Sequence, residues 1–222
     1  MPNLNHLIEE FIRTFPFFLK PLLLTFQLTV ASVVVGTVIG LFFALLKVSR
    51  LPIARLIANV YIAVIRGTPL IVQIFVLYFG FYKVVDLGQF WSATLALAIH
   101  SGAYIAEIFR GTIQSIDQGQ TEAGLSLGMS PALTMRHIVL PQALKRSIPP
   151  LGNQFILSLK ESSLAAFIAM DELFAMARRL SAETFDEMTY FLIVAFYYLV
   201  IVLIFTAIVN RLEKRLSKRG AN

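Results

Sequence analysis

Long apolar stretches separated by short polar segments dominate this chain. Three of these stretches contain no charged residue; Arg66 is the single charge in a fourth, and Lys160 and Glu161 are the charges in a fifth. A helix of about 20 apolar residues crosses the roughly 30 Å of hydrocarbon in a bilayer. The pattern therefore predicts an all-α membrane protein with five transmembrane helices. In chain order the predicted spans are 21–46, 56–82, 87–106, 147–170 and 188–210.

The first 19 residues show a different pattern, because apolar residues recur there at intervals of three and four. This spacing places one apolar face on a helix and predicts an amphipathic helix lying on the membrane surface. A disordered tail is the alternative. We therefore divide the chain into an interfacial helix at 1–19, a five-span domain at 20–211 and a basic tail at 212–222. The residues on the apolar face are Leu4, Leu7, Ile8, Phe11, Ile12 and Phe15.

The basic residues predict the orientation in the membrane. Of the 19 Lys and Arg residues, 12 fall in segments that share a side with the C-terminus and five, Lys83 among them, fall on the other side. Cytoplasmic segments carry the excess of Lys and Arg in membrane proteins. The sequence thus predicts an N-terminus outside and a cytoplasmic C-terminus. Membrane orientation explains the basic tail, so nucleic-acid binding is not needed to account for its positive charge.

Two absences narrow the chemistry of the chain. It contains no cysteine, which excludes a disulfide framework, a thiolate metal site and a cysteine nucleophile. It also lacks the G-x-x-x-x-G-K-[ST] sequence that cradles nucleotide phosphates. We predict no metal or cofactor site in this chain and no enzymatic activity of its own.

The segment between the third and fourth spans, residues 112–146, is longer than a simple turn requires. Residues 120–127 read as a short helix that Gly128 ends, because glycine is the usual C-terminal stop. Ser130 then caps a second helix with Pro131 at its first position. We expect Pro141 to end that second helix. We therefore expect residues 112–146 to form a compact helical bracket on the cytoplasmic face. A surface helix without a partner is the alternative.

After this bracket, Pro149 and Pro150 are expected to mark the entry to the fourth span. Within the bracket the residues resemble the EAA motif, E-A-A-x3-G-x9-I-x-L-P, of bacterial ABC importer permeases. Gly124 replaces the second alanine of the motif, which exchanges one small residue for another. The residues that match, and that the resemblance assigns to coupling with an ATPase, are Glu122, Ala123, Gly124, Gly128, Ile138, Leu140 and Pro141.

Four further segments are similar to the polar amino acid branch of the same family, which includes the glutamine and basic amino acid permeases. They are residues 66–69, 101–111, 151–154 and 160–164. That branch usually has Asn where this chain has His100, which leaves the substrate open. The resemblance implies the type I ABC importer permease fold in a bacterial inner membrane. It also implies an identical or different second permease, two cytoplasmic ATPases that bind ATP and Mg, and an extracytoplasmic amino acid binding protein.

Ionisable residues inside a bilayer are costly and suggest function. A zwitterionic amino acid needs an anion for its ammonium group, for which Glu107 and Glu161 are the candidates. Arg66, Lys160, or backbone N–H groups near Gly102 and Pro69 are candidates for its carboxylate. Structural pairing, such as Glu107 with Arg110 or Arg66 with Glu161, is the alternative. The remaining pathway candidates are Thr68, Tyr104, Ser101, Gly102, Ser162 and Ser163.

The segment 66–69 also interrupts an otherwise continuous span. Pro69 lacks an N–H group and kinks or breaks a helix, which transporters use to build sites and gates. We therefore expect a hinge that lines the pathway, with a purely structural kink as the alternative. The functional alternatives to an ATP-driven importer are an ion-gradient-driven transporter or a small channel, neither of which explains the cytoplasmic bracket. A membrane-embedded enzyme is a third, weakened because the sequence shows no intramembrane catalytic motif.

Overall fold

The computed structural model describes residues 3–82 and 84–220, so Lys83 and the last two residues of the basic tail lie outside the described residues. Every element of the described chain is a helix, as expected for an all-α protein. Two elements, η1 and η2, are π-helical, and η3 is a 3₁₀ helix. In chain order they are α1 (Leu4–Val48), α2 (Pro52–Arg66), α3 (Leu70–Phe75), η1 (Val76–Gly80), α4 (Gly88–Gln114), α5 (Gln118–Ser126), α6 (Pro131–Thr134), η2 (Met135–Val139), α7 (Leu140–Glu161), η3 (Ser162–Ile168), α8 (Leu173–Thr184) and α9 (Glu187–Gly220).

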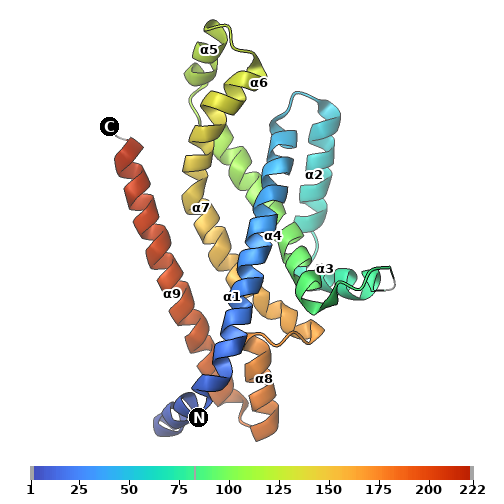
Figure 1. Ribbon diagram of the computed structural model, residues 1–222, viewed down its shortest axis with the longest axis vertical. Helices are drawn as coiled ribbons and strands as arrows, with labels where there is room; N and C mark the ends of the chain where they lie inside the picture. The colour runs from blue at the N-terminus through green and yellow to red at the C-terminus, as the bar shows by residue number, and fades with distance from the viewer. Residues whose placement is uncertain (1–2, 83, 221–222) are drawn as a thin grey trace.

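The helices form an elongated bundle with two distinct ends (Figure 1). The short helices α5 and α6, the turn between α1 and α2, and the C-terminus lie toward one end. The N-terminus and α8 lie at the other end, and α3 with η1 projects sideways from the bundle. This arrangement separates the polar loop after α4 from the polar segment before α9 by the length of the bundle.

Helices α1 and α4 form the centre of the fold and touch through glycines. A Cβ atom added to Gly36 would lie 2.4 Å from Ser101 Oγ, and one added to Gly40 would lie 2.5 Å from Ile105 Cγ2. Small residues allow helix backbones to approach closely where lipid supplies no hydrophobic driving force. Any larger side chain at either position would force the two helices apart.

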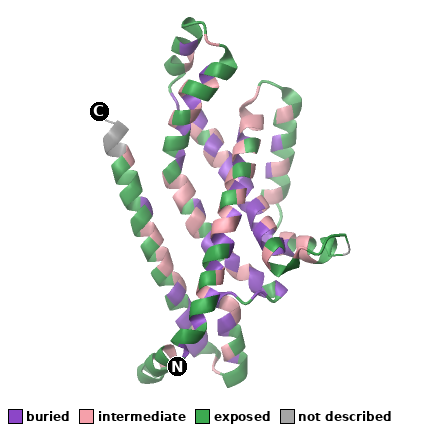
Figure 2. Ribbon diagram, in the orientation of Figure 1, coloured by how far each residue is buried: buried purple, intermediate pink, exposed green. Residues whose placement is uncertain are grey.

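Three helices of the described chain are long and apolar enough to cross a membrane, namely α1, α4 and the 187–216 part of α9. The pair formed by α2 and the 70–80 segment counts as a fourth span if its 102° bend is accepted within one span. Helix α7, in the region of the expected fourth span, does not meet the same criterion, so the count of five stays a prediction. Much of α9 is exposed in the isolated chain (Figure 2), as is typical of a helix that faces lipid.

The structure contradicts the expectation that Pro141 ends a helix. The chain continues from α6 through the π-helical turn η2 into α7, and Pro141 occupies the first turn of α7. A π-helical turn is wider than an α-helical one and shifts the hydrogen-bond register, which accommodates a residue without an N–H group. The side-chain amide of Gln142 donates from Nε2 to the Ile138 carbonyl oxygen at 2.9 Å. Pro149 and Pro150 lie inside α7, and the entry to the fourth span at these residues stays a prediction.

The N-terminal helix is continuous with the first span. Helix α1 runs from Leu4 to Val48 and contains Pro16 and Pro21. Its first turns lean away from the line of the rest of the helix (Figure 1), as proline within a helix commonly causes. The proposed boundary of an interfacial segment at residue 19 stays a prediction.

Candidate functional site

The break between α2 and α3 presents the residues of the predicted hinge. Helix α2 ends at Arg66 and α3 begins at Leu70, with a bend of 102° between the two segments. The guanidinium of Arg66 lies over the ring of Tyr104, 4.9 Å from its centroid, in a cation–π contact between α2 and α4. Arg66 and Thr68 are exposed in the isolated chain. The structure thus confirms the interruption of this span and brings Arg66 to Tyr104 rather than into an ion pair with Glu161.

Two residues that the sequence analysis did not assign to the pathway complete this cluster. Gln73 of α3 donates its side-chain amide to Thr68 Oγ1 at 2.9 Å, and its oxygen lies 3.2 Å from His100 Nδ1. The ring of His100 in turn lies 5.3 Å from that of Tyr104. The five side chains form a polar group that joins the broken span to α4.

Glu107, near the C-terminal end of α4, is held by two cations. Its Oε1 accepts from Lys47 Nζ of α1, and its Oε2 accepts from Arg110 Nε at 2.8 Å. Arg110 also donates to Gln114 on the next turn. Both carboxylate oxygens are therefore occupied by side chains of this chain. The geometry matches the structural alternative considered for Glu107.

Glu161 lies where α7 gives way to η3, and its environment is different. Its Oε2 is buried and has no hydrogen-bond partner among the described residues. The neighbouring Lys160 is exposed. The hydroxyls of Ser162 and Ser163 donate to the backbone carbonyls of Leu159 and Lys160, both at 2.7 Å. Of this group, Glu161 keeps an acceptor atom that no described residue satisfies.

Ser101 and Gly102 face a different neighbour from Tyr104. Ser101 is fully buried against Gly36 of α1. A Cβ atom on Gly102 would approach Ile39 of α1 at 3.0 Å and the Tyr61 hydroxyl at 2.9 Å. Both residues therefore lie within helix packing, and the structure does not bring them together with Arg66. Backbone N–H groups near Gly102 are part of the regular helix α4.

The loop after α4 folds into the expected pair of short helices. Glu122 and Ala123 are exposed on α5, whereas Gly124 is buried. A Cβ atom at Gly124 would lie 2.8 Å from Thr134 Cγ2, which explains why glycine stands where the motif has alanine. Gly128 has φ +80°, which favours glycine, and the Ser130 side chain caps α6. The remaining motif residues, Ile138, Leu140 and Pro141, follow in η2 and the first turn of α7.

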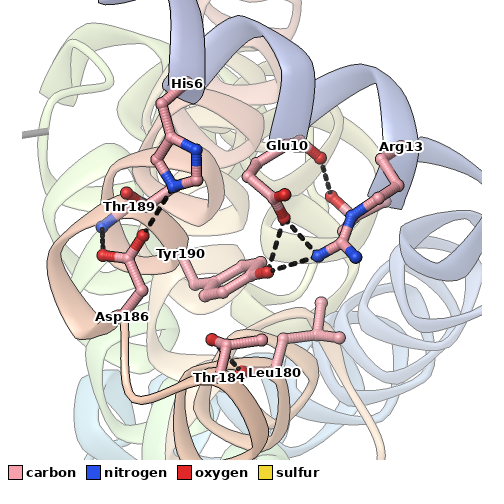
Figure 3. A network of polar contacts seen from close by, with 9 residues as sticks. His6, Glu10, Arg13, Leu180, Thr184, Asp186, Thr189 and Tyr190 are labelled. Carbon is pink, nitrogen blue, oxygen red and sulfur yellow. Dashed lines mark hydrogen bonds and ion pairs between the residues drawn. The ribbon is translucent and has the colours of Figure 1, made fainter. Parts of the chain in front are cut away.

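A second polar cluster ties the N-terminal turns of α1 to the start of α9 (Figure 3). Glu10 accepts from the Tyr190 hydroxyl at 2.6 Å, and Arg13 donates to both Glu10 and Tyr190. His6 Nε2 lies 2.9 Å from Asp186 Oδ2. Hydrogen bonding from Thr189 and from His6 lowers the pKa of Asp186. These contacts join segments that lie 177–180 residues apart in the sequence.

A third contact between the same parts of the chain involves the fully buried carboxylate of Glu172, which caps helix α8. It accepts from the backbone N–H groups of Phe174 at 2.9 Å and Ala175 at 2.7 Å, and from the Tyr198 hydroxyl at 3.0 Å. Burial raises the pKa of Glu172 to about 7, although these hydrogen bonds oppose the shift. Leu173 N donates to Thr25 Oγ1 of α1 at 3.1 Å. Helices α1, α8 and α9 thus meet at one point.

A bundle of apolar helices, one broken span and a projecting pair of short helices define a transport permease. The chain belongs to the family described as binding-protein-dependent transport system inner membrane component, whose family model matches residues 36–218. It is accordingly a multi-pass protein of the inner membrane.

Curated relatives narrow the branch of the family. The chain is 40% identical over 205 residues to the probable amino-acid ABC transporter permease protein YckA of Bacillus subtilis, covering 92% of this chain and 91% of the relative. It is 39% identical to the glutamine transport system permease protein GlnP of Escherichia coli, covering 91% and 94%. The arginine transport system permease protein ArtQ of Bacillus subtilis is 35% identical, with 91% and 93% covered.

Solved structures agree with this fold. A chain of an amino acid ABC transporter crystallised with histidines is 40% identical and superposes with a TM-score of 0.85, covering 92% of this chain and 96% of that chain. The inward-facing MetNI methionine ABC transporter is 19% identical with a TM-score of 0.77, which supports the fold alone. The type I importer permease fold expected from the sequence is thereby confirmed.

Proposed function

We propose that this chain is the membrane-spanning subunit of an ATP-driven importer for polar amino acids, with glutamine or basic amino acids as the substrates. The names of its relatives support this substrate class, since they include glutamine, arginine and cystine permeases. The observation that carries the mechanism is the unbroken path from α6 through η2 into α7, which ends at Glu161. Movement imposed on the loop can reach a membrane carboxylate along one continuous helix.

The partners follow from the same arrangement. Two cytoplasmic ATPases supply ATP and Mg²⁺ binding, and Glu122 on the exposed face of α5 contacts one of them. A second permease, identical or different, completes the membrane unit within the bilayer. An extracytoplasmic binding protein delivers the amino acid to the segment from Asp171 to Glu187. The position of α5, α6 and the basic C-terminus at one end, opposite the N-terminus and α8, supports an N-terminus outside and a cytoplasmic C-terminus (Figure 1).

We assign the substrate contacts to side chains that keep a hydrogen-bond donor or acceptor available for a ligand. Glu161 is the acceptor for the substrate ammonium group, because its buried Oε2 has no partner among the described residues. Arg66 is the donor for the carboxylate, because its exposed guanidinium lies over the Tyr104 ring and is in no ion pair with a carboxylate of the described residues. Lys160, Thr68 and the serines at 162 and 163 are secondary candidates. Glu107 is excluded from direct contact by its two cationic partners.

Transport then proceeds by alternating access. ATP binding draws the two ATPases together and moves the loop around Glu122, and α7 carries this movement into the bundle. The bundle closes on one side of the membrane and opens on the other. The site between Glu161 and the broken span is thereby exposed to each side in turn. No covalent step occurs in this chain, and the energy comes from the partner ATPases.

The test is charge reversal at the coupling surface. Glu122→Lys, assayed in proteoliposomes with the ATPase and the binding protein, is expected to abolish ATP-driven uptake of the amino acid. Glu213→Lys on α9 is a matched control, since Glu213 is an exposed acidic residue near the C-terminus and outside the loop. Uptake that survives Glu122→Lys contradicts the coupling role. Wild-type uptake that needs an ion gradient and no ATP favours the secondary transporter instead.

A further inference from the structure

The break between α2 and α3 leaves backbone carbonyl groups without their helical partners. In a continuous helix the Ile65 carbonyl would accept from the N–H group of residue 69, but Pro69 has none. The Thr68 carbonyl also loses its helical partner, because Val72 N donates instead to the Pro69 carbonyl at 3.1 Å. Unsatisfied backbone groups are particularly costly at membrane depth. The bend can persist only if other donors reach these oxygens.

One side chain reaches both of them. Gln73 Nε2 donates to the Ile65 carbonyl at 2.8 Å and lies 3.2 Å from the Thr68 carbonyl. It also donates to Thr68 Oγ1, whose own hydroxyl donates to the Val64 carbonyl at 2.9 Å. A primary amide has two N–H donors on one atom, which serve several acceptors gathered on one side. The hydrogen bonds of the break therefore converge on Gln73.

His100 of α4 sets the orientation of the Gln73 side-chain amide. Gln73 Oε1 lies 3.2 Å from His100 Nδ1, so the amide nitrogen faces the break when His100 donates through Nδ1. With the amide turned the other way, its oxygen would face the two carbonyl oxygens and its N–H groups would face His100. A donor at residue 100 thus selects the orientation that satisfies the break.

Side-chain packing does not fill the inside of the bend. An open apolar groove of about 290 Å³ lies there, and its lining includes Val64, Ile65, Gln73, Ala96 and Ile99. On this side the polar contacts span the bend, while Leu70 and Ile74 pack α3 into the core against α4 on the other side. The polar contacts also place Arg66, the last residue of α2, over Tyr104, whose ring adjoins that of His100.

We propose that Gln73 is a positioning residue that holds the α2–α3 break in its bent form, with His100 orienting its amide, and so sets Arg66 for the substrate. The inference rests on the proposed transport function and assigns a residue to the site that the sequence motif does not mark. Gln73 itself does not touch the amino acid. It acts through the backbone of residues 65–68 and the position of the Arg66 guanidinium.

The first measurement follows the shape of the break and does not depend on transport. Because the chain has no cysteine, single cysteines at the exposed positions Val64 and Phe79 can carry spin labels in the assembled complex. We expect Gln73→Leu to broaden the distance distribution and lengthen it toward the about 22 Å of a straight helix over that interval. An unchanged distribution overturns the proposal, whatever the uptake.

The second measurement is the KM for uptake in proteoliposomes. Gln73→Leu is expected to raise KM about tenfold, as the loss of hydrogen bonds to otherwise unpaired backbone carbonyls predicts, while the variant still assembles with the ATPase. His100→Asn keeps an N–H donor and is expected to retain near wild-type KM, whereas His100→Leu should resemble Gln73→Leu. A Gln73→Leu, His100→Leu double variant should be no worse than Gln73→Leu alone, because His100 acts through Gln73.

The outcomes separate the two proposals. Failure of wild-type protein to take up amino acids with ATP contradicts the proposed function and leaves the spin-label result to judge Gln73. Wild-type transport together with an unchanged KM in Gln73→Leu overturns the positioning role alone. Equal losses in His100→Asn and His100→Leu also overturn it, because they would show that the imidazole is needed for something other than an N–H donor.

Discussion

Two carboxylates in the membrane domain, Glu107 on α4 and Glu161 at the end of α7, have opposite surroundings. Glu107 binds Lys47 with one oxygen and Arg110 with the other. Glu161 has a buried oxygen with no hydrogen-bond partner in the described part of the chain. The two residues are the same in chemistry and comparable in their apolar sequence context, but the fold neutralises only one of them.

The difference shows that the presence of an intramembrane charge does not identify a binding residue by itself. A carboxylate whose oxygens are filled by neighbouring cations stabilises helix packing, here between α1 and α4. A carboxylate left with an open acceptor is poised for a ligand. Changes at the two sites are therefore expected to separate transport from stability.

The largest expected effect is on transport by Glu161→Gln. We expect kcat/KM for uptake to fall about 100-fold, because a hydrogen bond to a charged group contributes about 1.5–3 kcal/mol and a factor of ten corresponds to about 1.4 kcal/mol. The thermal midpoint should stay the same or rise, since a buried charge is removed. Uptake assays with the assembled transporter and thermal unfolding of the same sample check both parts. Normal uptake by this variant would remove Glu161 from the substrate site.

The next effect is on stability by Glu107→Gln. This change leaves Lys47 and Arg110 without their counter-ion and should lower the free energy of unfolding by about 2 kcal/mol, below the range for fully buried pairs because the groups are partly exposed. KM should change little. Thermal unfolding in detergent, alone and with Lys47→Met added, measures the coupling, and the double variant should recover part of the loss. A raised KM with an unchanged midpoint would reverse the roles of the two carboxylates.

A smaller effect is expected from a third carboxylate, Glu172. Burial raises its pKa from 4.5 to about 7, so the folded protein binds this proton more tightly than the unfolded chain. Stability from this group is complete below pH 4.5 and is lost as the pH rises through about 7. We expect a loss of about 1 kcal/mol between pH 6 and pH 7. Thermal midpoints across this range should flatten in Glu172→Gln, and equal slopes in both proteins would contradict the shift.

Sequence patterns predicted the features that depend on local spacing. The break at 66–69 follows from Pro69, and the contact between Glu107 and Arg110 follows from their separation of three residues. The two short helices after α4 follow from Gly128 and Ser130. Each of these features is decided by residues within one or two helical turns.

Features that depend on distant parts of the chain were missed. Lys47 lies 60 residues from Glu107, and His6 lies 180 from Asp186, so no local pattern pairs them. The sequence does indicate a role for Gln73. Pro69 leaves the Ile65 carbonyl without a backbone donor, and Gln73, one turn further on, carries a side-chain amide that can donate instead. Pro141 was misjudged because a π-helical turn relieves the restriction that proline imposes on an α-helix.

The glycine contacts between α1 and α4 bear on how the molecule moves. Backbones that touch at Gly36 and Gly40 have no room to slide past each other, since each step would drive a side chain into the opposite helix. The two helices therefore behave as one rigid frame during a transport cycle. The displacement must be taken up by the parts that border this frame, among them the bent α2–α3 segment, which borders α4 through polar contacts. The α1–α4 pair is thus the static part of the transporter, and the α2–α3 break with the Gln73 amide is a mobile part beside it.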